Sequence, residues 1–177
     1  MFLALDLPGA ARASIGRWRD AALGGHAGLR PVGDEALHVT LVFLGRRPQE
    51  TVERVWRTAS GALAGAPAAQ LAAVGPKAVP PRRPRVLALD LEDRGGRAAA
   101  LHERLVAALV AAGLHRAEQR PLWPHVTVAR MSGRARPPAF AAPPLPGPFT
   151  ATRVTLYRSD LHPGGARYAP LERIELG

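Results

Sequence analysis

The sequence predicts an α+β fold built from two pseudo-symmetric lobes of antiparallel-rich sheet, with flanking helices around a central cleft. Three observations support this prediction. The string Leu-Ala-Leu-Asp-Leu occurs at residues 3–7 and again at residues 87–91. A His-x-Thr string follows each copy at nearly the same distance, beginning at His38 and at His125. Segments with strand and helix patterns alternate along the chain, and several neighbouring strands favour antiparallel pairing.

The first half begins with an alternating strand over residues 2–7. Pro8 suits a helix start, so a helix is expected over 9–23, where a glycine pair follows. Residues 36–44 are strongly apolar, stop at a glycine and predict a second strand. The spacing of apolar residues over 49–63 predicts an amphipathic helix.

The second half repeats this order. We expect a strand over 70–79 and another over 85–91, the latter matching the first strand of the chain. Leucines at helical spacing predict a helix over 96–112, and the second His-x-Thr string lies in a strand over 122–130. Proline, glycine and arginine dominate 132–148, which is expected to be an exposed loop. Two closing strands are expected at 149–158 and 168–176.

Composition limits the class of protein. A chain of 177 residues, 47% of them hydrophobic, fits a single bilobal domain over residues 1–177. No apolar run approaches the ~20 residues that a membrane span needs. The N-terminal residues lack the basic region of a secretory signal. The absence of cysteine excludes disulfides and thiolate catalysis and fits a cytoplasmic protein. We also expect a monomer without membrane association.

The net charge of +10 favours an anionic partner. Arginine provides nearly all of the positive charge, and Lys77 is the only lysine. Guanidinium groups suit bidentate contacts with phosphate. The alternative is the codon bias of a GC-rich genome, which would explain much of the preference for arginine over lysine but not the positive balance. Composition therefore supports affinity for nucleic acid.

The paired His-x-Thr strings are the candidate catalytic residues. Because side chains alternate along a strand, His38 and Thr40 share one face, as do His125 and Thr127. One neutral and one protonated imidazole can accept and donate a proton at neutral pH. The threonine hydroxyls can donate hydrogen bonds to phosphoryl oxygens. The pattern predicts acid–base chemistry on a phosphate without a metal.

The strings that surround these residues resemble a known family. They are residues 2–8, 38–45 and 124–130, together with a closing segment from 156–159 through 165–168. The chain resembles the 2H phosphoesterases, and among them the bacterial RNA 2′,3′-cyclic phosphodiesterases, also called 2′-5′ RNA ligase-like proteins. The resemblance covers essentially the whole chain.

The resemblance implies a role for each motif residue. His38 would be the proton donor to the leaving oxygen, and His125 the base that activates water. Thr40 and Thr127 would hold the phosphate. The family opens a 2′,3′-cyclic phosphate at an RNA end and leaves a 2′-phosphate, without a cofactor. The implied substrate is RNA or a nucleotide with a 2′,3′-cyclic phosphate.

Four neighbouring residues are candidates for contact with the substrate. Strict alternation places Arg130 on the face opposite His125, so it is either a phosphate contact or a solvated strand end. The same alternation places Phe43 on the opposite face and favours core packing over base stacking. Trp123 shares the face of His125 and either stacks on a nucleobase or fills the core. Tyr168 is a candidate residue of the cleft.

Three further polar residues are expected to be structural. Asp6 and Asp90 end or cap the repeated strands, and His102 lies on the surface of its helix. The chain has no cysteine, and its histidines and carboxylates do not occur at the spacing of metal ligands. No metal site is therefore predicted. The alternative functions are a 2′-5′ RNA ligase, a small cyclic-nucleotide phosphodiesterase, and a non-catalytic RNA-binding protein on the same fold. A pure binder would have no need of both histidines.

Overall fold

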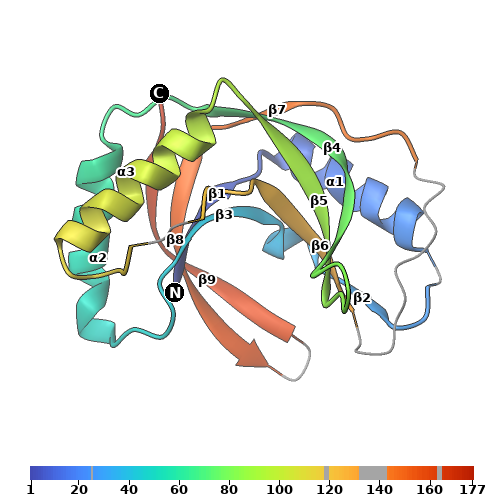
Figure 1. The fold of residues 1–177 in the computed structure, drawn as a ribbon, viewed down its shortest axis with the longest axis horizontal. Helices are drawn as coiled ribbons and strands as arrows, with labels where there is room; N and C mark the ends of the chain where they lie inside the picture. The colour runs from blue at the N-terminus through green and yellow to red at the C-terminus, as the bar shows by residue number, and fades with distance from the viewer. Residues whose placement is uncertain (25, 118–119, 132–142, 163–164) are drawn as a thin grey trace.

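One curved sheet and three α-helices make up the computed structural model, which describes residues 1–24, 26–117, 120–131, 143–162 and 165–177 (Figure 1). The helices and strands of the first half are β1 (Phe2–Asp6), α1 (Gly9–Leu23), β2 (Leu29–Pro31), β3 (His38–Phe43) and α2 (Val52–Leu63). Those of the second half are β4 (Ala69–Val79), β5 (Val86–Arg94), α3 (Arg97–Ala111), β6 (His125–Met131), β7 (Phe149–Ala151), β8 (Arg153–His162) and β9 (Gly165–Glu175). Two 3₁₀ turns are η1 (Asp34–Ala36) and η2 (Gln49–Thr51).

The strand order places the two histidine strands at the centre of the sheet. It reads β7-β4-β5-β6-β3-β1-β8-β9, and β2 pairs with β6 outside this path. Each of these pairings is antiparallel. The predicted α+β class and the antiparallel-rich sheet are confirmed.

The repeated strings are also a repeat in three dimensions. In the first half, Asp6 of β1 pairs with His38 of β3. In the second half, Asp90 of β5 pairs with His125 of β6. Because the two registers are equivalent, each aspartate of the repeated string lies across from one histidine. The similarity of the two sequence halves therefore reflects two copies of one strand pair.

The predicted elements agree with the observed ones to within a few residues, apart from three differences. The short strand β2 was not predicted, because three residues carry too little periodicity and its partner β6 is remote in sequence. The first predicted closing strand is divided into β7 and β8, and the second begins earlier, at Gly165. Of the predicted loop at 132–148, residues 132–142 lie outside the described residues.

Helices α2 and α3 pack together on one side of the sheet, whereas α1 lies on the other side of the molecule (Figure 1). The leucine stripe of α3 is fully buried, as its spacing predicts. His102 was expected at the surface of this helix, and that prediction is wrong. It is buried with 7% exposure, because it lies at the edge of the stripe, facing β3.

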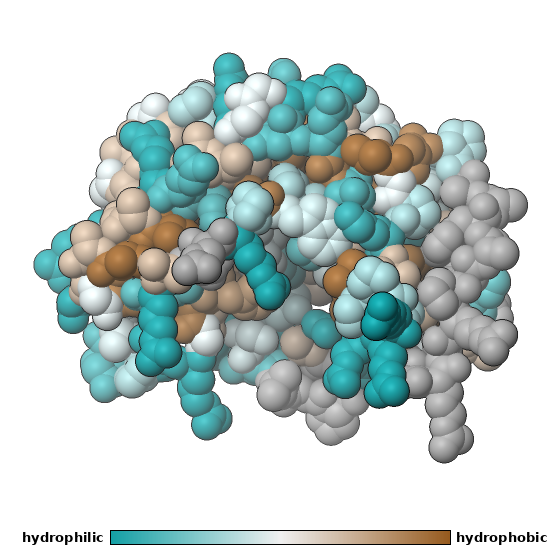
Figure 2. All heavy atoms as spheres, in the orientation of Figure 1, coloured by the Kyte–Doolittle hydropathy of each residue, from teal (hydrophilic) through white to brown (hydrophobic). Residues whose placement is uncertain are grey.

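Hydrophobic surface is visible on the side of the molecule where α2 and α3 lie (Figure 2). A cavity of about 460 Å³ along α3 is lined there by Val106, Val110 and Leu122. No helix within the described residues has the length and apolar character needed to cross a membrane.

Candidate active site

The contact between β3 and β6 brings the two motifs together. Val39 pairs with Val126 in an antiparallel register. The residues that flank this pair therefore face each other across the two strands. His38 lies next to Thr127, and Thr40 lies next to His125. We call the side of the sheet that carries these four side chains the histidine face.

Both histidines are held by the same local contact. Nδ1 of His38 lies 2.8 Å from the carbonyl oxygen of Ala36, and Nδ1 of His125 lies 2.8 Å from that of Trp123. A carbonyl oxygen can only accept, so Nδ1 carries the proton in each ring. Nε2 is then the reactive atom of both imidazoles. In His38, Nε2 lies 3.1 Å from the hydroxyl of Thr40.

A bulge in each strand pair changes what the histidine face presents. The register shifts between Leu3 and Ala4 where β1 meets β3, and at the equivalent position where β5 meets β6. One residue is added to each histidine strand after the threonine, so the alternation is reversed beyond that point. Phe43 and Arg130, each five residues after its histidine, thereby return to the histidine face.

This reversal corrects one expectation and decides another. Phe43 was expected in the core, and that prediction is wrong, since its side chain is 65% exposed. Strict alternation had placed Arg130 on the opposite face, but the bulge returns this exposed residue to the same face as His125. The positive charge of Arg130 contributes to lowering the pKa of His38.

The backbone carbonyl of the extra residue in each bulge is hydrogen-bonded to a residue outside its own strand pair. In β3 this residue is Leu41, whose carbonyl oxygen lies 2.8 Å from Nδ1 of His102. In β6 it is Val128, whose carbonyl oxygen accepts a 2.9 Å hydrogen bond from the backbone N–H of Val32. These contacts hold the bulges and the orientation of the side chains that follow them.

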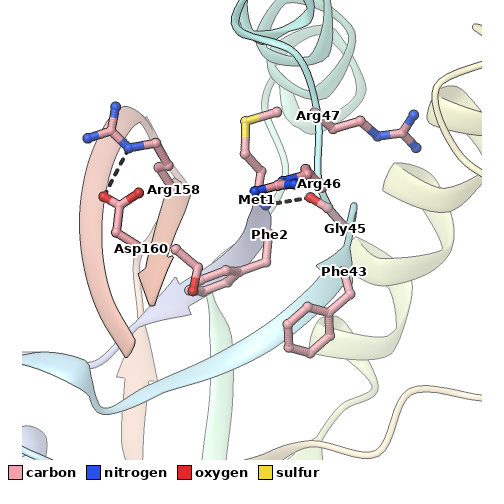
Figure 3. A pocket seen from close by; sticks show the side chains of 9 residues that line it. Met1, Phe2, Phe43, Gly45, Arg46, Arg47, Arg158 and Asp160 are labelled. Carbon is pink, nitrogen blue, oxygen red and sulfur yellow. Dashed lines mark hydrogen bonds and ion pairs between the residues drawn. The ribbon is translucent and has the colours of Figure 1, made fainter. Parts of the chain in front are cut away.

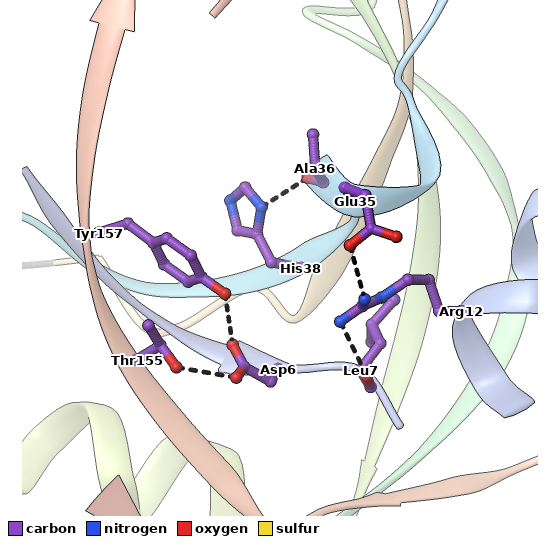
Figure 4. Close-up of polar contacts among 8 residues, drawn as sticks. All are labelled: Asp6, Leu7, Arg12, Glu35, Ala36, His38, Thr155 and Tyr157. Atoms are coloured by element: carbon purple, nitrogen blue, oxygen red, sulfur yellow. Dashed lines mark hydrogen bonds and ion pairs between the residues drawn. The ribbon is translucent and has the colours of Figure 1, made fainter. Parts of the chain in front are cut away.

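Aromatic rings surround His38. The ring of Phe2 stacks on the imidazole with centroids 4.8 Å apart, and Tyr168 meets it edge-on at 5.2 Å. Tyr168, predicted to line the cleft, thus contacts a motif histidine. Asp6 accepts hydrogen bonds from the hydroxyls of Thr155 and Tyr157, each at 2.8 Å (Figure 4). Burial, followed by the bond to Asp6, raises the pKa of Tyr157 to about 12.

His125 has a different aromatic neighbour. Trp123 stacks on its imidazole with centroids 4.0 Å apart and an interplanar angle of 15°. The indole N–H donates a 2.6 Å hydrogen bond to Asp90, and Lys77 lies 3.9 Å from the other oxygen of that carboxylate. Trp123 is half-buried and lies outside the core, so the prediction that it fills the core is wrong.

The electrostatic environment favours neutral His38 in the free protein. Burial lowers the pKa of His38, and the nearby charges of His125 and Arg130 lower it further. The hydrogen bond to Ala36 and the charge of Asp6 act in the opposite direction without cancelling these effects. A bound phosphate adds negative charge beside the ring and favours its protonated form.

Helix α1 fixes the turn that supplies the Ala36 carbonyl. Arg19, whose side chain is 8% exposed, forms a 2.8 Å ion pair with Asp34 at the start of η1. Arg12 forms a second ion pair, at 3.1 Å, with Glu35 (Figure 4). A Cβ at Gly16 would lie 2.8 Å from the Asp34 carboxylate, so a larger residue there would displace this carboxylate from its present position.

Metal binding was not predicted. Among the residues that the structure describes, no three histidine, cysteine or carboxylate side chains converge as a metal site would require. Metal independence stays a prediction.

Comparison with known proteins agrees with the fold and the motifs. The sequence matches the family model of the 2′-5′ RNA ligase superfamily over residues 7–163. An RNA 2′,3′-cyclic phosphodiesterase of Escherichia coli strain K12 is 32% identical over 179 residues, covering 99% of this chain and 96% of that protein.

Solved structures agree over nearly the whole chain as well. The crystal structure of a Thermus thermophilus protein matches with a TM-score of 0.81 and 28% identity, over 98% of this chain and 96% of that one. Escherichia coli LigT complexed with 3′-AMP matches with a TM-score of 0.79 and 30% identity, over 99% and 96% of the two chains. The sequence match across residues 7–163, together with this shared fold, shows that the chain belongs to the 2′-5′ RNA ligase superfamily of 2H phosphoesterases.

Proposed function

We propose that this protein hydrolyses a 2′,3′-cyclic phosphate at RNA ends to a 2′-phosphate, without a metal, using His38 and His125. The observation that carries the proposal is the matched pair of imidazoles, each with Nδ1 held by a backbone carbonyl, so that Nε2 is the atom of both rings that can exchange a proton with the substrate. The relative from Escherichia coli that is named an RNA 2′,3′-cyclic phosphodiesterase supports the same reaction.

The reaction needs one base and one acid. Nε2 of neutral His125 accepts a proton from water, and the water oxygen forms a bond to phosphorus. The bond between phosphorus and the 3′-oxygen breaks, and the 3′-oxygen takes a proton from Nε2 of protonated His38. The proton gained by one imidazole equals the proton lost by the other, and the product is a 2′-phosphate with a free 3′-hydroxyl.

Three side chains are suited to hold the phosphoryl oxygens. The hydroxyls of Thr40 and Thr127 lie next to the opposite histidines across the β3–β6 contact. The guanidinium of Arg130 adds a positive charge on the same face. Donors fixed before the reaction stabilise negative charge that grows on the phosphoryl oxygens in the transition state. This arrangement favours cleavage of a phosphodiester over simple binding.

The lowered pKa of His38 limits how it can act as the acid. In the free protein His38 is largely neutral at neutral pH, because its pKa lies below the ordinary value of 6.5. A substrate phosphate anion that replaces solvent beside the ring favours the protonated form, so His38 can acquire its proton as the substrate binds. Residues that change the charge near His38 should change the pH dependence of the reaction.

The test uses His38→Ala and His125→Ala, with the exposed loop residue His26→Ala as the matched control. Each motif variant should lose about a thousandfold in kcat on a 2′,3′-cyclic nucleotide, the range typical of a general acid or base. The assays contain EDTA, and phosphorus NMR identifies the product. Circular dichroism checks that the variants fold.

Three results would contradict the proposal. The first is turnover at the wild-type rate by either motif variant. The second is abolition of wild-type activity by EDTA, which would indicate a metal-dependent reaction. The third is a 3′-phosphate as the product.

A further inference from the structure

Arg30 of the short strand β2 has a like charge directly opposite it. It pairs with Arg130 where β2 meets β6, and both side chains are exposed. Opposite residues of an antiparallel pair have Cα atoms about 4.5–5.5 Å apart. Two like charges in this position repel each other and destabilise the strand pair. An anion bound between the two guanidinium groups would remove this repulsion.

The β6 bulge also places Arg30 on the histidine face. The backbone N–H of Val32 donates a 2.9 Å hydrogen bond to the carbonyl of Val128, so the contact that holds the bulge also fixes β2 beside β6. Because opposite residues share a face, Arg30 lies on the same face as Arg130 and Thr127. Thr127 and Arg130 are three residues apart, which is roughly 10 Å along a strand.

The turn between β4 and β5 brings two more arginines to this end of the sheet (Figure 1). Arg82 and Arg83 are exposed in this turn. The backbone of Arg85 accepts a 2.8 Å hydrogen bond from Met131, the last residue of β6, so the turn adjoins the strand end that carries Arg130. We call Arg30, Arg82, Arg83 and Arg130 the arginine surface.

The charge of the arginine surface is not neutralised within the part of the chain that the structure describes. Its four side chains form no hydrogen bond or ion pair there. Two acids of the adjoining segments are already bound to other groups. Asp34 forms an ion pair with Arg19 at 2.8 Å, and Asp90 lies 3.9 Å from Lys77. Exposed positive charge of this kind attracts a polyanion.

The opposite end of the histidine face has a different chemistry. A cavity of about 600 Å³ lies where β3 ends, and Phe2 and Phe43 are among the residues that line it (Figure 3). In contrast, no aromatic residue occurs in segments 29–32 and 79–86, which carry three of the four arginines of the surface. Arginines without aromatic neighbours contact phosphates but offer no platform on which bases stack.

We propose that the arginine surface binds the backbone of the RNA strand beyond the reacting phosphate. Arg130 contacts the reacting phosphate, Arg30 the phosphate next to it, and the two arginines of the turn contact phosphates farther along the strand. The surface continues from the reacting groups on one face, so its occupant is joined to the reacting phosphate. The proposal rests on the proposed function, because it takes the cyclic phosphate at the two histidines as its starting point.

The first test compares substrates of different length. They are a nucleoside 2′,3′-cyclic phosphate, a dinucleotide with a 2′,3′-cyclic end and a longer RNA with the same end. The measured quantity is kcat/KM for each RNA divided by kcat/KM for the nucleoside. Arg30→Gln should lower this ratio about tenfold for both RNAs, which corresponds to one lost phosphate contact. Arg82→Gln combined with Arg83→Gln should lower the ratio for the longer RNA only.

A second test measures binding without turnover. The probe is the longer RNA with a 2′-phosphate end, followed by fluorescence anisotropy at several salt concentrations. Arg30→Gln should reduce the slope of log affinity against log salt by about 0.7, the value for one phosphate of a single strand. The double variant of the turn should reduce it by about 1.4. The losses should be equal for probes of adenine and of uracil, because the surface contacts no base.

A third test uses the free protein. Arg30→Gln removes the repulsion between the paired arginines, so it should raise the midpoint of urea denaturation relative to the wild type. A lowered midpoint would show that Arg30 stabilises the fold, and it would overturn the assignment of this residue to anion binding.

The control variants are Arg104→Gln, and Arg104→Gln combined with Arg116→Gln, which remove the same charge from exposed positions on and after α3. The proposal is overturned if the variants of the arginine surface change the ratios and the salt slope no more than these controls do. If the wild type turns over no cyclic phosphate, the reaction proposal fails, while the binding test still decides whether the arginine surface holds RNA.

Discussion

The stacking of Trp123 on His125 leads to the sharpest prediction about the motif histidines. The ring lies 4.0 Å from the imidazole, and its N–H donates to Asp90 at 2.6 Å. Asp90 is also the residue that pairs with His125 across the two strands. We infer that Asp90 and Trp123 act together as positioning residues for His125.

The variants are Trp123→Phe, Asp90→Asn and the combination of both. Trp123→Phe keeps an aromatic ring but removes the N–H donor, and Asp90→Asn removes the charge of the acceptor. A hydrogen bond to a charged group contributes about 1.5–3 kcal/mol. The Asp90 side chain is 28% exposed, so we expect the lower part of this range.

Two measurements follow from this magnitude. Urea denaturation of the four proteins should give a coupling free energy of about 1.5 kcal/mol between the two positions. Turnover of a 2′,3′-cyclic nucleotide should show kcat reduced about tenfold in either single variant, with KM little changed. The reason is that a small displacement of Nε2 affects the transition state more than binding.

A tryptophan remote from the site is the control. Trp56 is half-buried on α2, and Trp56→Phe removes the same N–H and the same ring area. It should lower stability without lowering kcat. The reasoning is refuted if the effects of Trp123→Phe and Asp90→Asn on stability add to within about 0.5 kcal/mol. It is also refuted if both variants retain the kcat of the wild type.

Three further predictions follow from groups near the site. Asp6→Asn removes a charge that raises the pKa of His38, so one limb of the profile of kcat/KM against pH should move to lower pH. A profile in which neither limb moves would contradict the effect of the Asp6 charge on His38. His102→Leu leaves the Leu41 carbonyl without its hydrogen-bond donor, so the free energy of unfolding should fall by about 1–3 kcal/mol. Unchanged stability in urea denaturation would argue against a role for this contact. Tyr157 should titrate near pH 12 in ultraviolet absorbance, so its contribution to stability is present below about pH 10 and is lost as the pH rises through 12. Release of the Tyr157 proton near pH 10 would be inconsistent with the bond to Asp6.

The sequence was a reliable guide to the central strands. The repeated string and the His-x-Thr strings predicted strands β1, β3, β5 and β6, and the structure pairs them in equivalent registers. This succeeded because the period of two in a strand is a local property of the backbone. A buried leucine stripe in α3 was predicted for the same kind of reason, from a period of 3.6.

The surroundings of the histidines were less accessible to sequence reasoning. Asp6 and Asp90 were expected to end or cap strands. Asp6 is the last residue of β1, whereas Asp90 lies within β5. Each also accepts a hydrogen bond from an aromatic side chain near a histidine, which was not predicted. The position of the aspartates within the repeated string was a usable signal, because antiparallel pairing of the repeats places them across from the histidines. The partners of Asp6, Thr155 and Tyr157, carried no such signal.

Sequence alone determined the elements with a clear period, the duplicated strand pair and the four residues of the paired motifs. The tertiary structure decided the faces of Phe43 and Arg130, the burial of His102 and the cavity that Phe2 and Phe43 line where β3 ends. The physical reason lies in the bulges: one extra residue in each strand reverses the alternation, and the contacts that hold it come from α3 and from the segment after β2. No local pattern in the strand itself records that reversal.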